Sequence, residues 1–158
     1  ALPDTIIFNA TMTATEKGGE WQTAVQLIPA MSQETLRATA TSFTTVISAC
    51  GNEAGLWQEA LRLFSDMPRA RVKKNVISCN SVLRACERSR QGSTALQLLA
   101  EMDRSDAISF NATISACEKS SLWQQALALI ADMPAARLEL SVVTFGAGLA
   151  ACEAGTHW

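Results

Sequence analysis

Apolar residues recur along the chain at helical spacing, in short stretches separated by polar joints. In the stretch that begins at residue 107, Phe110, Ile114 and Cys117 are four and three places apart. Residues at this spacing lie on one face of an α-helix. The next stretch repeats the spacing from Trp123 to Ile130, after the polar joint at residues 119–121. The pattern therefore predicts pairs of amphipathic helices joined by short turns.

The predicted helix pairs are copies of one another. Ile47-Ser48-Ala49-Cys50 returns as Ile114-Ser115-Ala116-Cys117, and Trp57-Gln58-Glu59-Ala60-Leu61 returns as Trp123-Gln124-Gln125-Ala126-Leu127. We place the repeats at residues 5–39, 40–75, 76–106 and 107–141, with a partial repeat at 142–158 and an N-terminal extension at 1–4. One helix pair cannot bury its apolar face alone, whereas stacked neighbours can. The sequence thus predicts an all-α fold, an α-solenoid of tandem helix-turn-helix repeats.

Three features of the repeats carry further structural expectations. Pro68 and Pro134 should stop the second helix of their repeats, while Pro29 lies inside such a helix and should kink or shorten it. Cysteines recur at one equivalent place, where we expect small core residues without disulfides; they are Cys50, Cys86, Cys117 and Cys152. Tryptophans recur at another, where we expect packing between repeats; they are Trp21, Trp57, Trp123 and Trp158.

Composition and charge narrow the class of protein. The hydrophobic fraction of 48% is enough for a continuous core and too high for a disordered chain. A net charge of −2, from 13 basic and 15 acidic residues, is not that of a strongly basic nucleic-acid binder. No apolar run reaches the length that crosses a membrane. The chain begins at Ala1 without Met or a targeting pattern, so we expect a processed form or a fragment.

Motifs for catalysis or metal binding are missing from the sequence. No nucleophile–base pair, carboxylate dyad or Gly-rich phosphate loop is recognisable, and the one histidine is His157. No pair of cysteines has the CxxC spacing of a zinc site. We therefore expect no enzyme, no catalytic residue, no cofactor and no metal.

The repeats resemble the pentatricopeptide repeat. The resemblance rests on Ile-Ser-Phe-Asn-Ala-Thr-Ile-Ser-Ala-Cys-Glu-Lys at 108–119 and Trp-Gln-Gln-Ala-Leu-Ala-Leu-Ile-Ala-Asp-Met at 123–133, and it covers residues 5–158. That family usually has Tyr at the fourth place, where this chain has Phe8, Phe43, Cys79, Phe110 and Phe145. The tetratricopeptide repeat is the nearest alternative, but its signature needs a Tyr early in the first helix, and this chain has none.

The resemblance implies a right-handed superhelix that binds single-stranded RNA, one base per repeat, and not DNA. It also implies an organelle, plastid or mitochondrion, with the plastid favoured. The fifth and last residues of a repeat together read one base in this family. The pairs here are Asn9 with Thr39, Thr44 with Asn75, Asn80 with Asp106, and Asn111 with Ser141. In the family's code they read a pyrimidine, adenine, uracil and cytosine, which implies the target pyrimidine-A-U-C.

Two further sets of residues take roles from the resemblance. The second residue of each repeat is implied to wedge between bases; these residues are Ile6, Thr41, Ile77, Ile108 and Val143. Basic residues of the first helices are implied as phosphate contacts; these are Lys17, Arg84, Arg88 and Lys119. The fifth repeat has Gly146 at its fifth place, which offers no side chain to read a base.

The residues themselves leave other interpretations open. Asparagine is a poor helix former, so its recurrence at the fifth place indicates a hydrogen bond, either to a base or to the neighbouring repeat. The last residues all belong to the types that cap helices. Basic residues near a helix end also complement its dipole, and neighbouring glutamates such as Glu16 and Glu118 oppose their field. The alternative function is therefore a scaffold for protein subunits of a large organellar complex, such as a photosystem or ribosome, without RNA.

Overall fold

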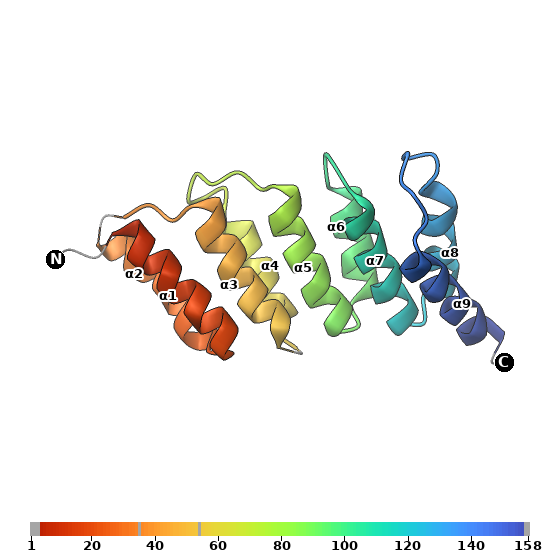
Figure 1. The fold of residues 1–158 in the computed structure, drawn as a ribbon, viewed down its shortest axis with the longest axis horizontal. Coiled ribbons are helices and arrows are strands. Elements are labelled where there is room, and N and C mark those ends of the chain that lie inside the picture. The colour runs from red at the N-terminus through yellow and green to blue at the C-terminus, as the bar shows by residue number, and fades with distance from the viewer. Residues whose placement is uncertain (1–3, 35, 54, 157–158) are drawn as a thin grey trace. The chain divides into compact units, whose positions relative to one another are not determined.

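The computed structural model describes residues 4–34, 36–53 and 55–156, and over these ranges it consists of helices, turns and loops without a strand (Figure 1). His157 and Trp158 lie outside the described residues. The described helices, in chain order, are α1 (Thr5–Gly18), α2 (Trp21–Gln33), α3 (Ala40–Asn52), α4 (Trp57–Asp66), α5 (Val76–Arg88), α6 (Gly92–Ala100), α7 (Ala107–Lys119), α8 (Trp123–Asp132) and α9 (Val142–Thr156).

The odd-numbered helices begin at side-chain caps. The Thr39 hydroxyl accepts a hydrogen bond from the Ser42 backbone N–H (3.3 Å), and an Asp106 carboxylate oxygen accepts one from the Ser109 N–H (2.8 Å). Such caps satisfy N–H groups that have no partner inside the first turn. Asp4, Asn75 and Ser141 cap α1, α5 and α9 in the same way. The five helices thus start at Thr5, Ala40, Val76, Ala107 and Val142.

Prolines act differently in the second helices of the repeats. α4 and α8 end before Pro68 and Pro134, which confirms that expectation. α2 continues through Pro29 and has 13 residues, against 10 in α4, so Pro29 does not shorten the helix, and the alternative of a kink stays a prediction. Ala24 and Met31, on either side of Pro29, are fully buried. The helix thus continues although proline cannot donate a backbone hydrogen bond inside it.

The first compact unit comprises residues 1–85. In it α1 packs against α2 and α3, and α3 packs against α4. Phe43, Ile47 and Met12 are among its buried side chains. Gly51 lies next to α5, where a β-carbon would meet the Ser81 carbonyl oxygen at 3.4 Å, an ordinary van der Waals contact.

The second compact unit comprises residues 86–158. α7 packs against α6, α8 and α9, around a core that includes Phe110 and Ile114. Trp123 packs against Gly155, where a β-carbon would lie 3.0 Å from the indole ring, and this confirms the packing role expected of Trp123. Gly92 stands where other repeats have Trp, and its β-carbon would lie only 2.8 Å from the Ser120 Oγ. The end of α7 therefore leaves no room for a side chain at that place.

The cysteines at equivalent places differ in burial. Cys50, Cys86 and Cys117 are fully buried free thiols, as expected of small core residues, and burial raises the pKa of Cys86 to about 11. Cys152 is exposed, so the expectation of a core position was wrong there. It lies on α9, which has described helices packed against one side only. Among the described residues, no helix is both long enough and apolar enough to cross a membrane.

Candidate functional site

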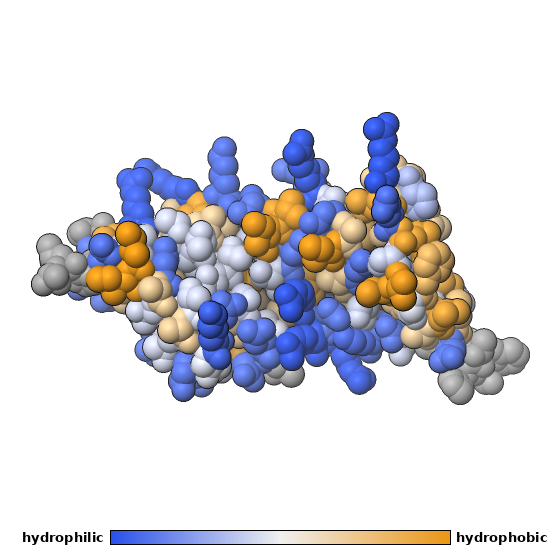
Figure 2. All heavy atoms as spheres, in the orientation of Figure 1, coloured by the Kyte–Doolittle hydropathy of each residue, from blue (hydrophilic) through white to orange (hydrophobic). Residues whose placement is uncertain are grey.

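The second residues of the repeats lie exposed at the beginnings of the odd-numbered helices. Their exposed fractions are high for apolar side chains, at 76% for Ile6, 67% for Ile77, 60% for Ile108 and 67% for Val143. Thr41 is exposed as well. Figure 2 shows apolar patches over α1 and the beginning of α5, and over α9. These side chains are free to contact a ligand, and their role as wedges between bases stays a prediction.

In the first unit, one hydroxyl connects both members of the pair Asn9 and Thr39. The Ser42 hydroxyl donates a hydrogen bond to the Asn9 Oδ1 at 2.7 Å. The same Ser42 Oγ lies 3.1 Å from the Thr39 hydroxyl, and together Thr39 and Ser42 form a capping box at the start of α3. Two residues 30 places apart in the sequence are therefore brought together around Ser42.

The pair Asn111 and Ser141 in the second unit has the same arrangement. The Thr144 hydroxyl donates to the Asn111 Oδ1 at 2.7 Å and lies 3.0 Å from the Ser141 hydroxyl. Ser42 and Thr144 occupy the third place of their repeats and are at most 1% exposed. Asn9 and Asn111 thus bond to the neighbouring repeat, and Thr39 and Ser141 cap the next helix, which are the interpretations that the residues had left open.

The remaining residues of the predicted pairs lie at the equivalent places. Thr44 is half-buried, and Asn75, which caps α5, is exposed. The Ser78 hydroxyl donates to the Asn75 carbonyl oxygen at 2.8 Å. Asn80 is only 9% exposed, and half-buried Asp106 caps α7. That any of these residues reads a base stays a prediction.

Acidic residues partly cancel the positive charge of the candidate phosphate contacts. Lys17, Arg84 and Arg88 are exposed. The Lys119 Nζ forms an ion pair with the Glu87 carboxylate at 2.7 Å, and the Ser115 hydroxyl donates to the same carboxylate oxygen at 2.8 Å. Such a pair neutralises much of the charge that would attract a phosphate, so Lys119 is the weakest of the four candidates.

A groove in the first unit has no counterpart in the sequence prediction. It holds about 960 Å³ and is lined by α2, α4 and the segments that follow each of them. Val25, Ile28 and Leu63 contribute apolar surface, and arginines and one carboxylate contribute charge. The charged lining residues are Arg37, Arg62, Asp66, Arg69 and Arg71. Basic charge therefore exceeds acidic charge around an apolar floor.

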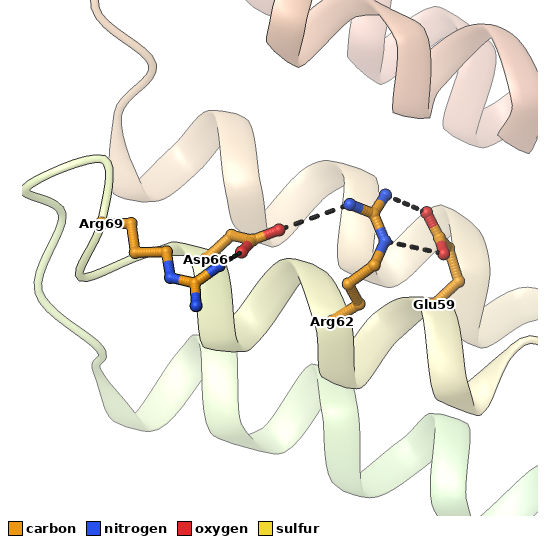
Figure 3. A network of polar contacts seen from close by, with 4 residues as sticks. All are labelled: Glu59, Arg62, Asp66 and Arg69. Carbon is orange, nitrogen blue, oxygen red and sulfur yellow. Dashed lines mark hydrogen bonds and ion pairs between the residues drawn. The ribbon is translucent and has the colours of Figure 1, made fainter.

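Two of these arginines belong to a network along α4 (Figure 3). Arg62 bonds to Glu59 and lies 3.4 Å from the Asp66 carboxylate, which also lies 3.4 Å from Arg69. The hydrogen bond from Arg62 lowers the pKa of Glu59. The network pairs Arg62, one of the residues that line the groove, with Glu59 and Asp66. Elsewhere, the described residues contain no cluster of His, Cys, Asp or Glu side chains that could hold a metal ion.

The repeats match a known family over most of their length. The family described as "Pentatricopeptide repeat-containing protein" matches residues 4–133. The chain belongs to the pentatricopeptide repeat family. No curated protein matches the sequence closely enough to count as a relative.

Solved pentatricopeptide repeat structures show the same α-solenoid fold. PPR10 in complex with an 18-nt psaJ RNA element superposes with a TM-score of 0.81 at 19% identity, over 96% of this chain and 23% of that one. The corresponding domain of Arabidopsis thaliana protein-only RNase P 1 in complex with tRNA gives 0.78 at 12% identity, over 91% and 78%. Nuclear RNase P 2 from A. thaliana gives 0.80 at 16% identity, over 99% and 36%. This chain therefore spans about a quarter of PPR10.

Sequence reasoning missed the buried hydroxyls at the third place of the repeats. Ser42, Ser78, Ser109 and Thr144 recur there, each three residues after a capping residue. A side chain three residues after an N-cap that bonds back to the backbone N–H of the cap is the pattern of a capping box, so this signal was available. The groove had no such signal, because residues of α2, α3, α4 and the segments that follow α2 and α4 line it together.

Proposed function

We propose that the chain is a non-catalytic scaffold that binds single-stranded RNA in a plastid or mitochondrion, one base per repeat, with the core target pyrimidine-A-U-C. The observation that carries the proposal is the convergence of Asn9 and of Asn111 with the last residue of the repeat to which each belongs. Asn9 and Thr39 meet at Ser42, and Asn111 and Ser141 meet at Thr144. Two polar side chains next to an exposed apolar residue suit a base, which needs edge contacts and stacking.

Family membership and the solved structures support this proposal. The titles of two similar structures name an RNA in the complex, an 18-nt psaJ element with PPR10 and a tRNA with RNase P 1. The first helices of this chain carry the polar pairs at equivalent places in successive repeats. Shared fold and repeated placement favour the same kind of ligand.

The expected affinity is low for this number of repeats. Stacking of four bases contributes about 4–12 kcal/mol, and the loss of freedom on association opposes this by about 4–15 kcal/mol. The ion pair between Lys119 and Glu87 also limits the attraction of phosphates. We therefore expect weak binding with a shallow dependence on salt.

A titration tests the proposed target. One labelled RNA carries cytosine-A-U-C in an unstructured context, and its partner carries the same bases in scrambled order. We expect tighter binding of the ordered sequence, measured by fluorescence anisotropy at low salt with the whole chain. Equal affinity for both RNAs at every salt concentration would contradict sequence-specific binding.

The groove of the first unit favours a second candidate function, the binding of a protein partner. Its apolar floor and its excess of arginines suit an extended or helical segment that carries apolar and acidic side chains. This function is tested by affinity capture from nuclease-treated organelle extract with the wild-type chain and with Arg37→Glu/Arg71→Glu. We expect cross-links from a bound protein to α2 and α4, lost in the double variant. Partners that all vanish after nuclease treatment would contradict it.

A further inference from the structure

The third residue of repeats two to five carries a buried hydroxyl, and the proposed reading pairs leave its role beyond helix capping unexplained. Four repeats have Ser or Thr there, and each is at most 1% exposed; they are Ser42, Ser78, Ser109 and Thr144. A hydroxyl removed from water is costly unless it has hydrogen-bond partners. Its partners therefore tell what this place contributes.

The number of protons fixes the direction of the hydrogen bonds around Thr144. A hydroxyl has one proton, and Thr144 donates it to the Asn111 Oδ1, which cannot donate in return. The Thr144 Oγ1 then accepts from Ser141, whose backbone N–H and hydroxyl lie 3.2 and 3.0 Å away. The protons thus point from the last residue of the repeat, through the third-place hydroxyl, to the fifth residue.

The first unit repeats this order of donors and acceptors. The Ser42 Oγ accepts from the Thr39 backbone N–H at 3.0 Å, lies 3.1 Å from the Thr39 hydroxyl and donates to the Asn9 Oδ1 at 2.7 Å. Repeat two provides a contrast, because its fifth residue, Thr44, has no carboxamide to orient. There the Ser78 hydroxyl donates to the Asn75 carbonyl oxygen, 2.8 Å away.

These bonds decide which polar atoms remain for a ligand. A carboxamide has one accepting oxygen and an NH₂ group with two protons. With the Asn111 Oδ1 turned to Thr144, the NH₂ group is the part left to donate to a ligand. The Ser141 hydroxyl donates to Thr144, and its oxygen, which accepts from the Thr144 backbone N–H, has a second lone pair left for a ligand. The pair then offers one donor and one acceptor in a fixed order.

We propose that Ser42 and Thr144 are specificity-determining positioning residues, which hold the Asn9 and Asn111 carboxamides with their NH₂ groups toward the ligand. This inference rests on the proposed binding of RNA by these pairs. The terminal torsion of Asn is broad and roughly two-fold, so without the hydroxyl either the oxygen or the nitrogen faces the base. The pair then loses its fixed order of donor and acceptor, and with it much of its choice between bases.

The test compares Thr144→Val with a matched control, Thr113→Val. Both changes replace a buried hydroxyl in the second unit by a methyl group of similar shape. Thr113 is fully buried and donates to the Ser109 carbonyl oxygen at 2.8 Å, within its own helix. Affinity is measured for four RNAs that differ only at the base assigned to Asn111 and Ser141, and for four that differ only at the base assigned to Thr44 and Asn75.

We expect Thr144→Val to lower the preference at its own base by about two- to tenfold, the loss of one hydrogen bond. Preference at the base of Thr44 stays unchanged, and Thr113→Val changes neither. Melting temperatures of both variants show that the two chains are folded to a similar degree. Unchanged preference in Thr144→Val, or an equal loss in Thr113→Val, would overturn the inference.

A second measurement needs no RNA and separates this inference from the proposed function. The NMR shift of the Asn111 side-chain carbonyl carbon and the order of its NH₂ group both report the bond to Thr144. We expect both to change in Thr144→Val and to stay the same in Thr113→Val. If the wild-type chain selects no base, the proposed function is wrong, whatever the NMR signals show. Identical Asn111 signals in all three proteins would overturn the orienting role, whatever the RNA titrations show.

Discussion

Helices α7 and α9 have the same pattern of residues in different surroundings. Phe110 and Ile114 of α7 are 8% and 0% exposed, whereas their counterparts Phe145 and Leu149 of α9 are 57% and 70% exposed. α7 has α6, α8 and α9 against it, while α9 has α7 and α8. The burial of a first helix therefore depends on the helices that follow it, as nearest-neighbour stacking requires.

The same apolar pattern is thus buried in one helix and exposed in the other. At an inner place the apolar residues of the fourth and eighth positions fill a core, and at α9 they form an exposed apolar surface. The capping arrangement is the same at the two helices, since Asp106 accepts a hydrogen bond from the third residue of α7 and Ser141 accepts one from the third residue of α9. Capping hydrogen bonds are thus set by residues three places apart in the sequence, and apolar burial is set by the neighbouring helices.

The largest expected effect comes from equivalent truncations in the two helices. Ile114→Ala should lower the free energy of unfolding by about 2–5 kcal/mol, because it leaves a cavity in a closed core. Leu149→Ala should change it by no more than about 0.5 kcal/mol, because the side chain is 70% exposed. Urea denaturation followed by circular dichroism measures both. Equal losses would show that α9 is packed as tightly as α7.

Alanine substitutions of two glycines should change the stability in opposite directions, one in the closed core and one on exposed α9. Gly92→Ala places a β-carbon 2.8 Å from the Ser120 Oγ and should cost about 1–3 kcal/mol of stability through overpacking. Gly146 of α9 has open space around it, so Gly146→Ala should stabilise the helix by up to about 1 kcal/mol. Thermal denaturation of the two variants should show a lower and a higher midpoint. Two shifts of the same sign would contradict this account of the packing.

Thiol chemistry gives a smaller, graded difference between the same helices. Burial raises the pKa of Cys117 from 9.0 to about 11, so at pH 8 its thiol stays protonated and unreactive, whereas Cys152 is exposed. We expect a disulfide reagent to modify Cys152 first in the folded chain, as peptide mass spectrometry can map, with Cys152→Ser as the control. Because folding raises this pKa, the buried thiol contributes its full share to the free energy of unfolding below pH 9, and this contribution is lost as the pH rises toward 11. Rapid modification of Cys117 in the folded chain would contradict its burial.

The sequence predicted the architecture because the fold is built from short-range signals that repeat. Apolar spacing placed Phe110 and Ile114 on one helix face, and capping residues such as Asp106 marked where helices begin. At Pro29 the sequence did not show whether α2 ends or continues, and α2 continues through it. Cys152 was expected in the core and is exposed, since its burial would need a neighbour that the repeat pattern alone does not supply.

The sequence predicted less of the candidate site than of the fold. The places of Asn9 and Asn111 were predictable from the family resemblance, but the bonds that hold them were not. Each bond joins residues 33 places apart, and it depends on how one repeat stacks on the next. The groove beside Arg62 is likewise lined jointly by α2 and α4, which no periodic signal marks.

The most direct test of base reading is a transfer of one pair's identity to another repeat. Thr44→Asn/Asn75→Asp gives the second repeat the same pair as Asn80 and Asp106, and aspartate keeps the cap of α5. Affinity is measured for four RNAs that differ only at the second base of the target. The account predicts that the wild-type chain prefers adenine there and that the double variant prefers uracil, with the other bases read as before. The same preference in both proteins, or none in either, would contradict it.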